Sequence, residues 1–224
     1  MAEFIPFKIL SGEENMQKDF AIFEKACCEK SKEPVLRFYG WLPACVSLGR
    51  NQSEDTINKK YCSDNGIDIV RRITGGRSLL HQDELTYSFV CSVDFIGNEN
   101  IQKSYEIISG ALLDGLKALG IEADFGHKKP DTKYNYCMLL STGADLNFQN
   151  KKLVGSAQYR ANGYILQHGS ILYTINQNHI KSIFNEEIGE KLITLSEILP
   201  EIKTEEIIFA LKSGFEKKFN VNFL

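Results

Sequence analysis

Hydrophobic residues recur at helical spacing in three long stretches of the chain. They predict amphipathic helices over residues 16–29, 100–119 and 204–219. The stripes expected to face inward are Met16, Phe20, Phe23, Ala26 and Cys27, then Ile101, Tyr105, Ile108, Leu112, Leu116 and Leu119, and finally Ile207, Ile208, Leu211, Phe215 and Phe219. A shorter helix is expected over residues 55–65 and should stop at Gly66, because glycine favours the left-handed conformation that ends helices.

Between the helices, apolar and polar residues alternate as they do in strands. Residues 85–93 alternate most cleanly, so a half-buried strand is expected there. The other expected strands cover residues 35–39, 45–48 and 68–72, and residues 144–148, 152–158 and 164–173 as antiparallel neighbours. Helices and strands mix without strict βαβ alternation. The predicted fold class is therefore α+β, with a mostly antiparallel or mixed sheet flanked by helices.

Length and composition fit one globular domain. The 224 residues are 43% hydrophobic and 25% charged, which suffices for a sizeable core. We expect a single domain over residues 1–224, with residues from about 180 onward as its helical C-terminal piece. A net charge of −3 argues against a nucleic-acid partner recruited by bulk charge. The N-terminus lacks a signal-peptide pattern and no long apolar run occurs, so no membrane association is expected.

Six cysteines are spread along the chain without a CxxC pair or a His/Cys cluster at zinc spacing. Several lie within apolar patterns, where a free cysteine behaves as a small hydrophobic residue. We therefore expect the reducing cytoplasm as the compartment and no structural metal.

Two short segments carry candidate chemistry. The first, RRITGGRSLLH at residues 71–81, leads a strand into two glycines flanked by arginines, and such loops let backbone N–H groups approach an anionic or polar ligand. The second, KKLVGSAQ at residues 151–158, places a lysine at the start of a strand of small residues. Each segment alone equally fits an ordinary structural turn or a solvated strand end.

Together and in this order, the segments resemble the biotin/lipoate protein ligase superfamily. RRITGGRSLLHQDELTYS is similar to the family's arginine–glycine loop and following strand, and KLVGSAQYRANGYILQHGSIL to its lysine motif and strand pair. The resemblance extends from the first helix to about Phe219, including the segment ITLSEIL. It implies the α+β catalytic domain of that superfamily.

Within the superfamily, the chain most resembles the cysteine-dependent octanoyltransferases of the bacterial lipoate pathway, the Bacillus-type group. The loop reads TGGR followed by HQDELTYS, and Cys137 precedes Lys152 by fifteen residues. We also expect no separate C-terminal domain after the final helix, unlike in many ligases. Two details depart from the family pattern. Ser78 stands where alanine is common, and the segment after Cys137 lacks the proline and aromatic residues of the family.

The resemblance implies a two-step mechanism. Cys137 would take the octanoyl group from octanoyl-acyl carrier protein and pass it to a lysine of a lipoyl domain, such as glycine cleavage H protein or a 2-oxoacid dehydrogenase E2. Lys152 would favour the thiolate and stabilise the negative charge that develops on the acyl oxygen. Thioester exchange is nearly isoenergetic and amide formation is downhill, so no cofactor is expected. Without the resemblance, Cys137 fits an inert cysteine in an apolar setting.

The remaining candidate residues are expected to bind substrate. They are Arg72, Thr74, Gly75, Gly76, Arg77, His81, Gly155 and Ser156, with the two glycines and Arg77 at the mouth of the acyl pocket. His81 could orient the loop or accept a proton from the incoming lysine, and these alternatives stay open. His168 is interpreted as structural, and His127 and His179 have no distinguishing context.

Four other functions fit parts of the sequence. An ATP-dependent lipoate ligase would form an acyl-adenylate at the same loop without needing a cysteine. An octanoyl amidotransferase would use a cysteine but take the acyl group from another lipoyl protein. A biotin ligase would have no use for Cys137, and an idle homologue that only binds a lipoyl domain would not need the pair Cys137 and Lys152.

Overall fold

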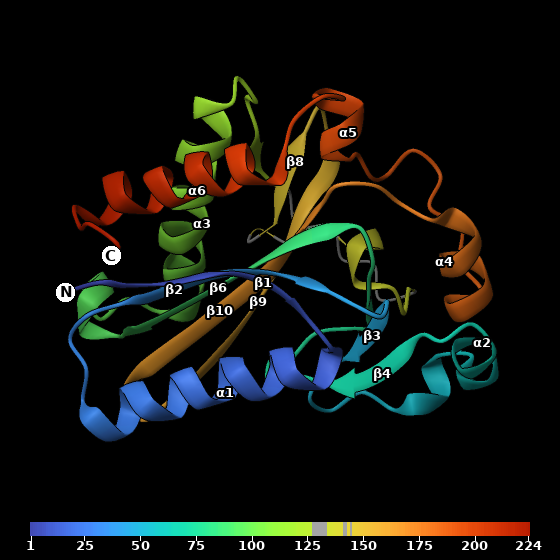
Figure 1. Ribbon diagram of the computed structural model, residues 1–224, viewed down its shortest axis with the longest axis horizontal. Coiled ribbons are helices and arrows are strands. Elements are labelled where there is room, and N and C mark those ends of the chain that lie inside the picture. The colour runs from blue at the N-terminus through green and yellow to red at the C-terminus, as the bar shows by residue number, and fades with distance from the viewer. Residues whose placement is uncertain (127–133, 141–142, 144) are drawn as a thin grey trace.

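The fold is built on a mixed sheet of seven strands, seen in a computed structural model that describes residues 1–126, 134–140, 143 and 145–224 (Figure 1). The strand order is β1-β2-β6-β10-β9-β8-β7. Within this sheet, β1 and β2 pair in parallel, and the other described neighbours pair antiparallel. The strands are β1 (Glu3–Leu10), β2 (Val35–Trp41), β6 (Glu84–Ser92), β7 (Asp124–Phe125), β8 (Leu146–Phe148), β9 (Lys151–Ala161) and β10 (Tyr164–Leu172). The predicted α+β class and the antiparallel run of the last strands are confirmed.

A second, three-stranded sheet lies beside one end of the large sheet (Figure 1). Its central strand β3 (Cys45–Leu48) pairs in parallel with β4 (Asp68–Arg71) and antiparallel with β5 (Leu79–His81). The two strands predicted on either side of residues 40–44 therefore belong to different sheets. This arrangement places the loop between β4 and β5 next to the end of β3.

Helices cover both faces of the large sheet. The helix α1 (Gly12–Glu29) lies along one face, and α3 (Ile101–Ala118) and α6 (Thr204–Phe219) lie on the other (Figure 1). The helices α3 and α6 cross closely at Gly214, which has no side chain. A Cβ atom added there would lie 2.3 Å from the Ala111 carbonyl oxygen. Most of the predicted stripes are buried there, including Leu112, Leu116 and Phe215.

Three expectations for the two long helices α1 and α3 need correction. The first helix begins at Gly12 rather than residue 16, because Ser11 and Glu14 form a reciprocal capping box. Its buried face is partly polar, with Asn15 and Asp19 inside, while Phe20 is 39% exposed. Ile101, at the start of α3, is likewise 61% exposed and does not belong to the core.

The strand β6 is not half-buried as predicted. Its second face, with Thr86, Ser88 and Val90, is also enclosed. This face packs against α1, and the ring nitrogen of Trp41 donates a hydrogen bond to Thr86 Oγ1 on it (2.8 Å). The small polar residues of β6 therefore face the interior of the protein rather than the solvent.

The predicted helix over residues 55–65 is broken. A 3₁₀ turn at Glu54–Thr56 is followed by α2 (Lys59–Asp64), because Asn58 caps a new helix by accepting from the Tyr61 N–H. Its expected end at Gly66 is confirmed by a φ of 63°. The remaining short elements are the 3₁₀ turns Asp94–Ile96 and Cys137–Leu139 (η3) and the helices α4 (Gln177–Phe184) and α5 (Leu195–Ile198).

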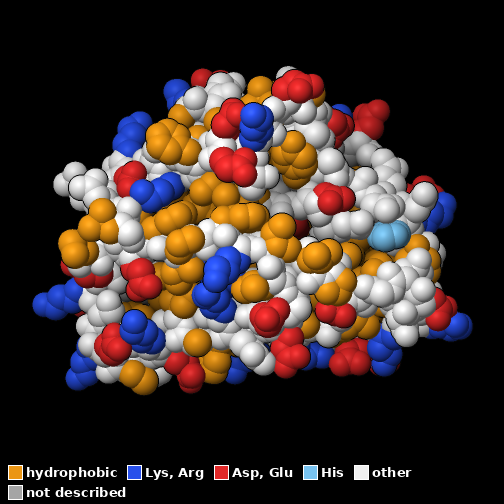
Figure 2. Space-filling view, viewed as in Figure 1, with side chains coloured by type: hydrophobic (Ala, Val, Ile, Leu, Met, Phe, Trp, Pro, Cys, Tyr) orange, Lys and Arg blue, Asp and Glu red, His pale blue; other side chains and the backbone are white. Residues whose placement is uncertain are grey.

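The edge strand β1 was not predicted from the sequence. Some of its apolar side chains are exposed to solvent. Hydrophobic side chains gather across the middle of the face on which β1 lies (Figure 2). Ile9 of this strand is 57% exposed, and the pairing with β2 shifts register between Ile5 and Lys8, around Pro6. Within the described ranges, none of the helices is both long and apolar enough to span a bilayer.

Candidate active site

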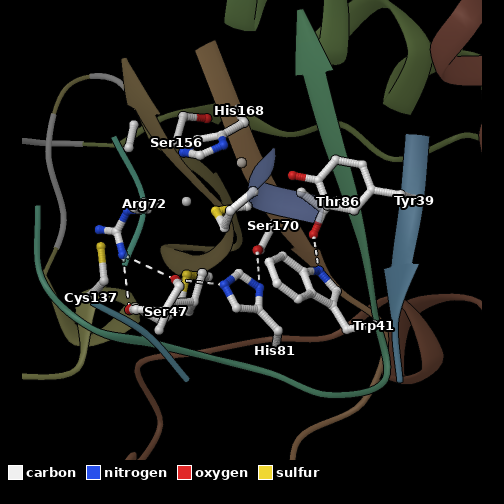
Figure 3. Close-up of a pocket in the computed structure, with 16 residues that line it drawn as sticks. Tyr39, Trp41, Ser47, Arg72, His81, Thr86, Cys137, Ser156, His168 and Ser170 are labelled. Carbon is white, nitrogen blue, oxygen red and sulfur yellow. Dashed lines mark hydrogen bonds between the residues drawn. The ribbon is translucent and has the colours of Figure 1, made fainter. Parts of the chain in front are cut away.

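A pocket opens where α1, the large sheet and the small sheet meet (Figure 3). Arg72 and Cys137 line one side, and Tyr39 and Trp41 line the opposite side. The pocket therefore joins a thiol and a positive charge at one end to an aromatic wall at the other.

Cys137 is the thiol that lines this pocket. It begins η3, and its backbone N–H donates to the Ser78 carbonyl oxygen (2.8 Å), which anchors the cysteine to the end of the arginine–glycine loop. By contrast, burial raises the pKa of Cys91 to about 12 and also raises the pKa of Cys45, so these core thiols are poor nucleophiles. The structure thus brings the predicted nucleophile to a pocket and leaves those two in the core.

Lys152 lies directly behind the Cys137 turn. Its ammonium is 3.0 Å from Asp145 Oδ2 and donates to the backbone carbonyl oxygens of Leu140 (2.6 Å) and Cys137 (3.2 Å). The side chain is only 4% exposed, whereas Lys151 is half-buried. Lys152 is therefore the inward-facing member of the lysine pair, as strand alternation requires.

Small residues on β9 and β10 make room for this arrangement. A Cβ atom added to Gly155 would lie 2.6 Å from Met138 Sδ and 3.1 Å from Lys152 Cε. Next to it, Ser156 Oγ exchanges a hydrogen bond with the Tyr87 hydroxyl (2.8 Å). Both residues predicted from the lysine motif, Gly155 and Ser156, line the pocket.

Gly155→Ala should lower acyl transfer by up to about a hundredfold, because its methyl group would displace Met138 and press on Lys152, and a displacement of about 1 Å near a reacting group can cost that much. Steady-state rates measured together with a thermal unfolding midpoint would check this. Gly143→Ala is the matched control, since a Cβ atom there meets no neighbour within 4 Å. A folded Gly155→Ala enzyme of normal activity would show that this close packing is not needed for the reaction.

Arg72 braces the arginine–glycine loop with all five of its N–H donors. Its Nε donates to Thr74 Oγ1 (3.0 Å), one terminal nitrogen to the backbone and side-chain oxygens of Ser47 (3.0 and 3.1 Å), and the other to the carbonyl oxygens of Gly75 (3.0 Å) and Arg77 (2.7 Å). Burial lowers the pKa of the Arg72 guanidinium, and a negative charge on Cys137 counteracts that shift. Arg72 is therefore a fixed positive charge beside the thiol.

Gly75, Gly76 and Arg77 lie beside the pocket rather than in its lining. They form a separate surface hollow with Asn51 and Gln52. Gly76 has a φ of 97°, a backbone conformation that favours glycine. Their role at the mouth of the pocket stays a prediction.

His81 is held on three sides. Its Nε2 is 2.7 Å from Ser47 Oγ, and its ring stacks on Trp41 at 3.8 Å between centroids (Figure 3). Its Nδ1 is 2.7 Å from Glu84 Oε1. Ser47, Glu84 and Trp41 were not singled out from the sequence. The register of β3 against β5 assembles Ser47 and His81, and a single sequence does not reveal such pairings.

His168 extends this polar network to the first helix. Its Nε2 is 2.8 Å from Thr74 Oγ1 and its Nδ1 is 3.2 Å from Asp19 Oδ2. Burial lowers the pKa of His168 despite the neighbouring carboxylate. Burial alone would raise the pKa of Asp19, but hydrogen bonds and charge from His168 and Arg37 hold it below its usual value. Asp19 and Arg37, charged residues within apolar patterns, were the available sequence signal for this network.

His179 lies outside the pocket, with Nδ1 3.0 Å from Gln82 Oε1. His127, and Ala144 at the start of a predicted strand, fall outside the described residues. The strand itself is present as β8 (Leu146–Phe148).

A mixed sheet with an arginine–glycine loop beside a buried lysine at the start of β9 defines the class of catalytic domain found in lipoate and biotin protein ligases. Residues 11–216 match the lipoyl protein ligase A/B catalytic domain, and the chain belongs to this family. The predicted superfamily is thereby confirmed.

Curated relatives share most of their length with this chain. The octanoyltransferase LipM of Clostridioides difficile is 38% identical over 219 residues, covering 94% of this chain and 76% of its own. That of Carboxydothermus hydrogenoformans is 34% identical over 239 residues, covering 99% and 87%. The fold matches that of a putative lipoate protein ligase from T. acidophilum with bound lipoic acid, with a TM-score of 0.82 at 22% identity over 100% of this chain and 88% of that one.

Proposed function

We propose that this chain is an octanoyltransferase that carries the acyl group on Cys137, between octanoyl-acyl carrier protein and a lysine of a lipoyl domain. The observation that supports this most directly is the position of Cys137 in the pocket, with Arg72 beside it and Lys152 behind its turn. The similarity to octanoyltransferases over most of the chain supports the same transfer chemistry.

The first half-reaction is a thioester exchange. The Cys137 thiolate attacks the carbonyl carbon of the donor thioester, the C–S bond to the carrier breaks, and the carrier thiolate takes up a proton. Arg72 supplies a positive charge close to the attacking sulfur. The Lys152 ammonium would stabilise the tetrahedral intermediate by donating to the acyl oxygen, in exchange for its hydrogen bond to the Cys137 or Leu140 carbonyl oxygen.

The second half-reaction transfers the acyl group to nitrogen. A neutral lysine amine attacks the Cys137 thioester, the C–S bond breaks, and an amide forms while Cys137 returns as a thiolate. The apolar and aromatic wall of Met16, Trp41 and Leu79 offers a surface for the hydrocarbon chain between the two steps.

The transfer should proceed without ATP or magnesium, because both steps exchange one acyl bond for another of equal or lower energy. Purified enzyme incubated with octanoyl-acyl carrier protein alone should gain the mass of one octanoyl group, and a lipoyl domain added later should acquire it. Intact-mass spectrometry with and without ATP provides the measurement. Strict dependence on ATP, with free octanoate or lipoate as donor, would establish a ligase instead.

Intact-mass spectrometry also separates the two functions that form a thioester on Cys137, octanoyltransferase and octanoyl amidotransferase. An octanoylated lipoyl domain offered in place of octanoyl-acyl carrier protein should acylate Cys137 more slowly, because an amide is a poorer acyl donor than a thioester. Faster acylation from the octanoylated lipoyl domain would identify an amidotransferase and would contradict the donor proposed here.

A further inference from the structure

Amide formation requires a group that removes a proton from the attacking amine, and Lys152 is poorly placed for this. Its ammonium already donates to Asp145, to the Cys137 carbonyl oxygen and to the Leu140 carbonyl oxygen. An ammonium that donates three hydrogen bonds has no lone pair to accept a proton. The proton acceptor of the second half-reaction must therefore be sought elsewhere in the pocket.

A second set of reactive side chains lines the same pocket. A chain of two hydrogen bonds, each 2.7 Å long, runs from Ser47 Oγ to His81 Nε2 and from His81 Nδ1 to Glu84 Oε1. Figure 3 shows the first of them, between Ser47 and His81. Ser47 and His81 line the pocket together with Cys137, and Glu84 lies behind them with its side chain 1% exposed. A base oriented by a carboxylate and within reach of a hydroxyl is the arrangement that general-base chemistry uses.

The neighbours of this hydrogen-bonded chain fix the direction of its hydrogen bonds. Glu84 Oε1 also accepts from the Thr86 and Ser170 hydroxyls (2.6 and 2.7 Å), so the carboxylate acts as acceptor and His81 Nδ1 carries the hydrogen. His81 Nε2 then presents its lone pair to the Ser47 hydroxyl. Arg72 donates into Ser47 Oγ (3.1 Å), which orients the Ser47 hydrogen towards His81.

The histidine is also held rigidly. Its ring stacks on Trp41 with an interplanar angle of 15°, and Trp41 is itself fixed by its hydrogen bond to Thr86. A base that is prepositioned in this way does not need to reorganise when the amine arrives.

We propose that His81 is the proton acceptor of the amide-forming step, acting through the Ser47 hydroxyl, and that Glu84 is its positioning residue. As the amine nitrogen bonds to the acyl carbon, one N–H proton passes to Ser47 Oγ while the Ser47 proton passes to His81 Nε2. The bond from carbon to Cys137 Sγ then breaks, leaving amide, thiolate and imidazolium, and the imidazolium returns its proton to solvent. This assignment rests on the proposed function of Cys137.

Single-turnover kinetics of the two half-reactions test the assignment. In His81→Ala, acylation of Cys137 by octanoyl-acyl carrier protein should stay close to the wild-type rate, while transfer to the lipoyl domain should fall by about 10²–10⁴-fold. Imidazole added to the solution should restore part of the transfer rate, because it can occupy the space beside Trp41. His179→Ala is the matched control, since that histidine lies outside the pocket and should affect neither step.

Two further variants keep the test decisive if His81→Ala does not fold. Glu84→Gln leaves the imidazole in place but removes the carboxylate that fixes its tautomer. Ser47→Ala removes the relay hydroxyl, while the Ser47 carbonyl oxygen still accepts from the same nitrogen of Arg72. Both should slow transfer more than acylation. An equal loss in both half-reactions, or unchanged transfer, would overturn the proposal.

An octanoyl ester found on Ser47 of the wild-type enzyme would also overturn it, because Ser47 would then be a nucleophile rather than a relay. If no octanoyl group ever appears on Cys137, the proposed function itself fails. If instead Cys137 forms a stable thioester and the His81 variants transfer it at the normal rate, only the role proposed for His81 fails.

Discussion

Replacing Cys137 with serine should abolish the hydroxylamine-labile octanoyl adduct and lower transfer to a lipoyl domain by more than about a thousandfold, as nucleophile replacements do. Serine differs from cysteine by one atom, so the η3 turn and its bond to the Ser78 carbonyl oxygen should persist. The hydroxyl, however, holds its proton at neutral pH and is a far weaker nucleophile than a thiolate. Intact-mass spectrometry and a single-turnover transfer assay would measure both effects.

Cys28→Ser is the control for this experiment. Cys28 is an exposed thiol near the end of α1, so it would reveal unspecific acylation by the reactive thioester donor. Near-normal modification of a lipoyl domain by Cys137→Ser would contradict the nucleophile assignment and favour a mechanism without an acyl-enzyme.

Lys152→Ala should slow both half-reactions by a similar factor, about a hundred- to a thousandfold. The same ammonium would face the acyl oxygen in each step, since both tetrahedral intermediates form at Cys137. Arginine should not restore the rate, because a planar guanidinium is larger and directs its donors differently from a compact ammonium. Rapid-quench measurements of acylation and transfer, made separately on each variant, would supply the factors.

Loss of stability must be separated from loss of catalysis in this variant. Lys152→Ala leaves the Asp145 carboxylate in a buried site without its cation, which costs about 3–5 kcal/mol in comparable pairs. Thermal unfolding followed by circular dichroism gives the temperature at which the variant is still folded for kinetics. Lys151→Ala should retain activity, and a larger loss there than in Lys152→Ala would move the catalytic role to Lys151.

The sequence predicted the elements that have strong local signals. Residues 204–219 form the expected helix, and the strands on either side of Asn162 and Gly163 pair as expected. Cys137 contacts both Ser78, at the end of the arginine–glycine loop, and Lys152 of the lysine motif. These features depend on periodicity and on short motifs, which a single sequence contains.

The periodicity of hydrophobic residues did not predict the interior polar network. The apolar stripe of the first helix suggested that Phe20 faces inward, yet Asp19 is buried instead because Arg37, Tyr39 and His168 satisfy its carboxylate. Similarly, Glu84 lies three residues beyond His81 on a separate strand, and only the folded turn brings the two together. Such partners are defined by tertiary contacts between distant segments.

Because protein hydrogen bonds hold Arg72 in place, folding itself fixes the position of the positive charge at this site. All five donors of the guanidinium end on protein oxygens, so its charge reaches a thiolate through space, without a hydrogen bond to substrate. Water or flexible side chains would have to reorient as negative charge appears on sulfur or oxygen, but a clamped cation does not. The pocket therefore has a low reorganisation energy for anionic intermediates, and the same contacts that shape the loop supply that property.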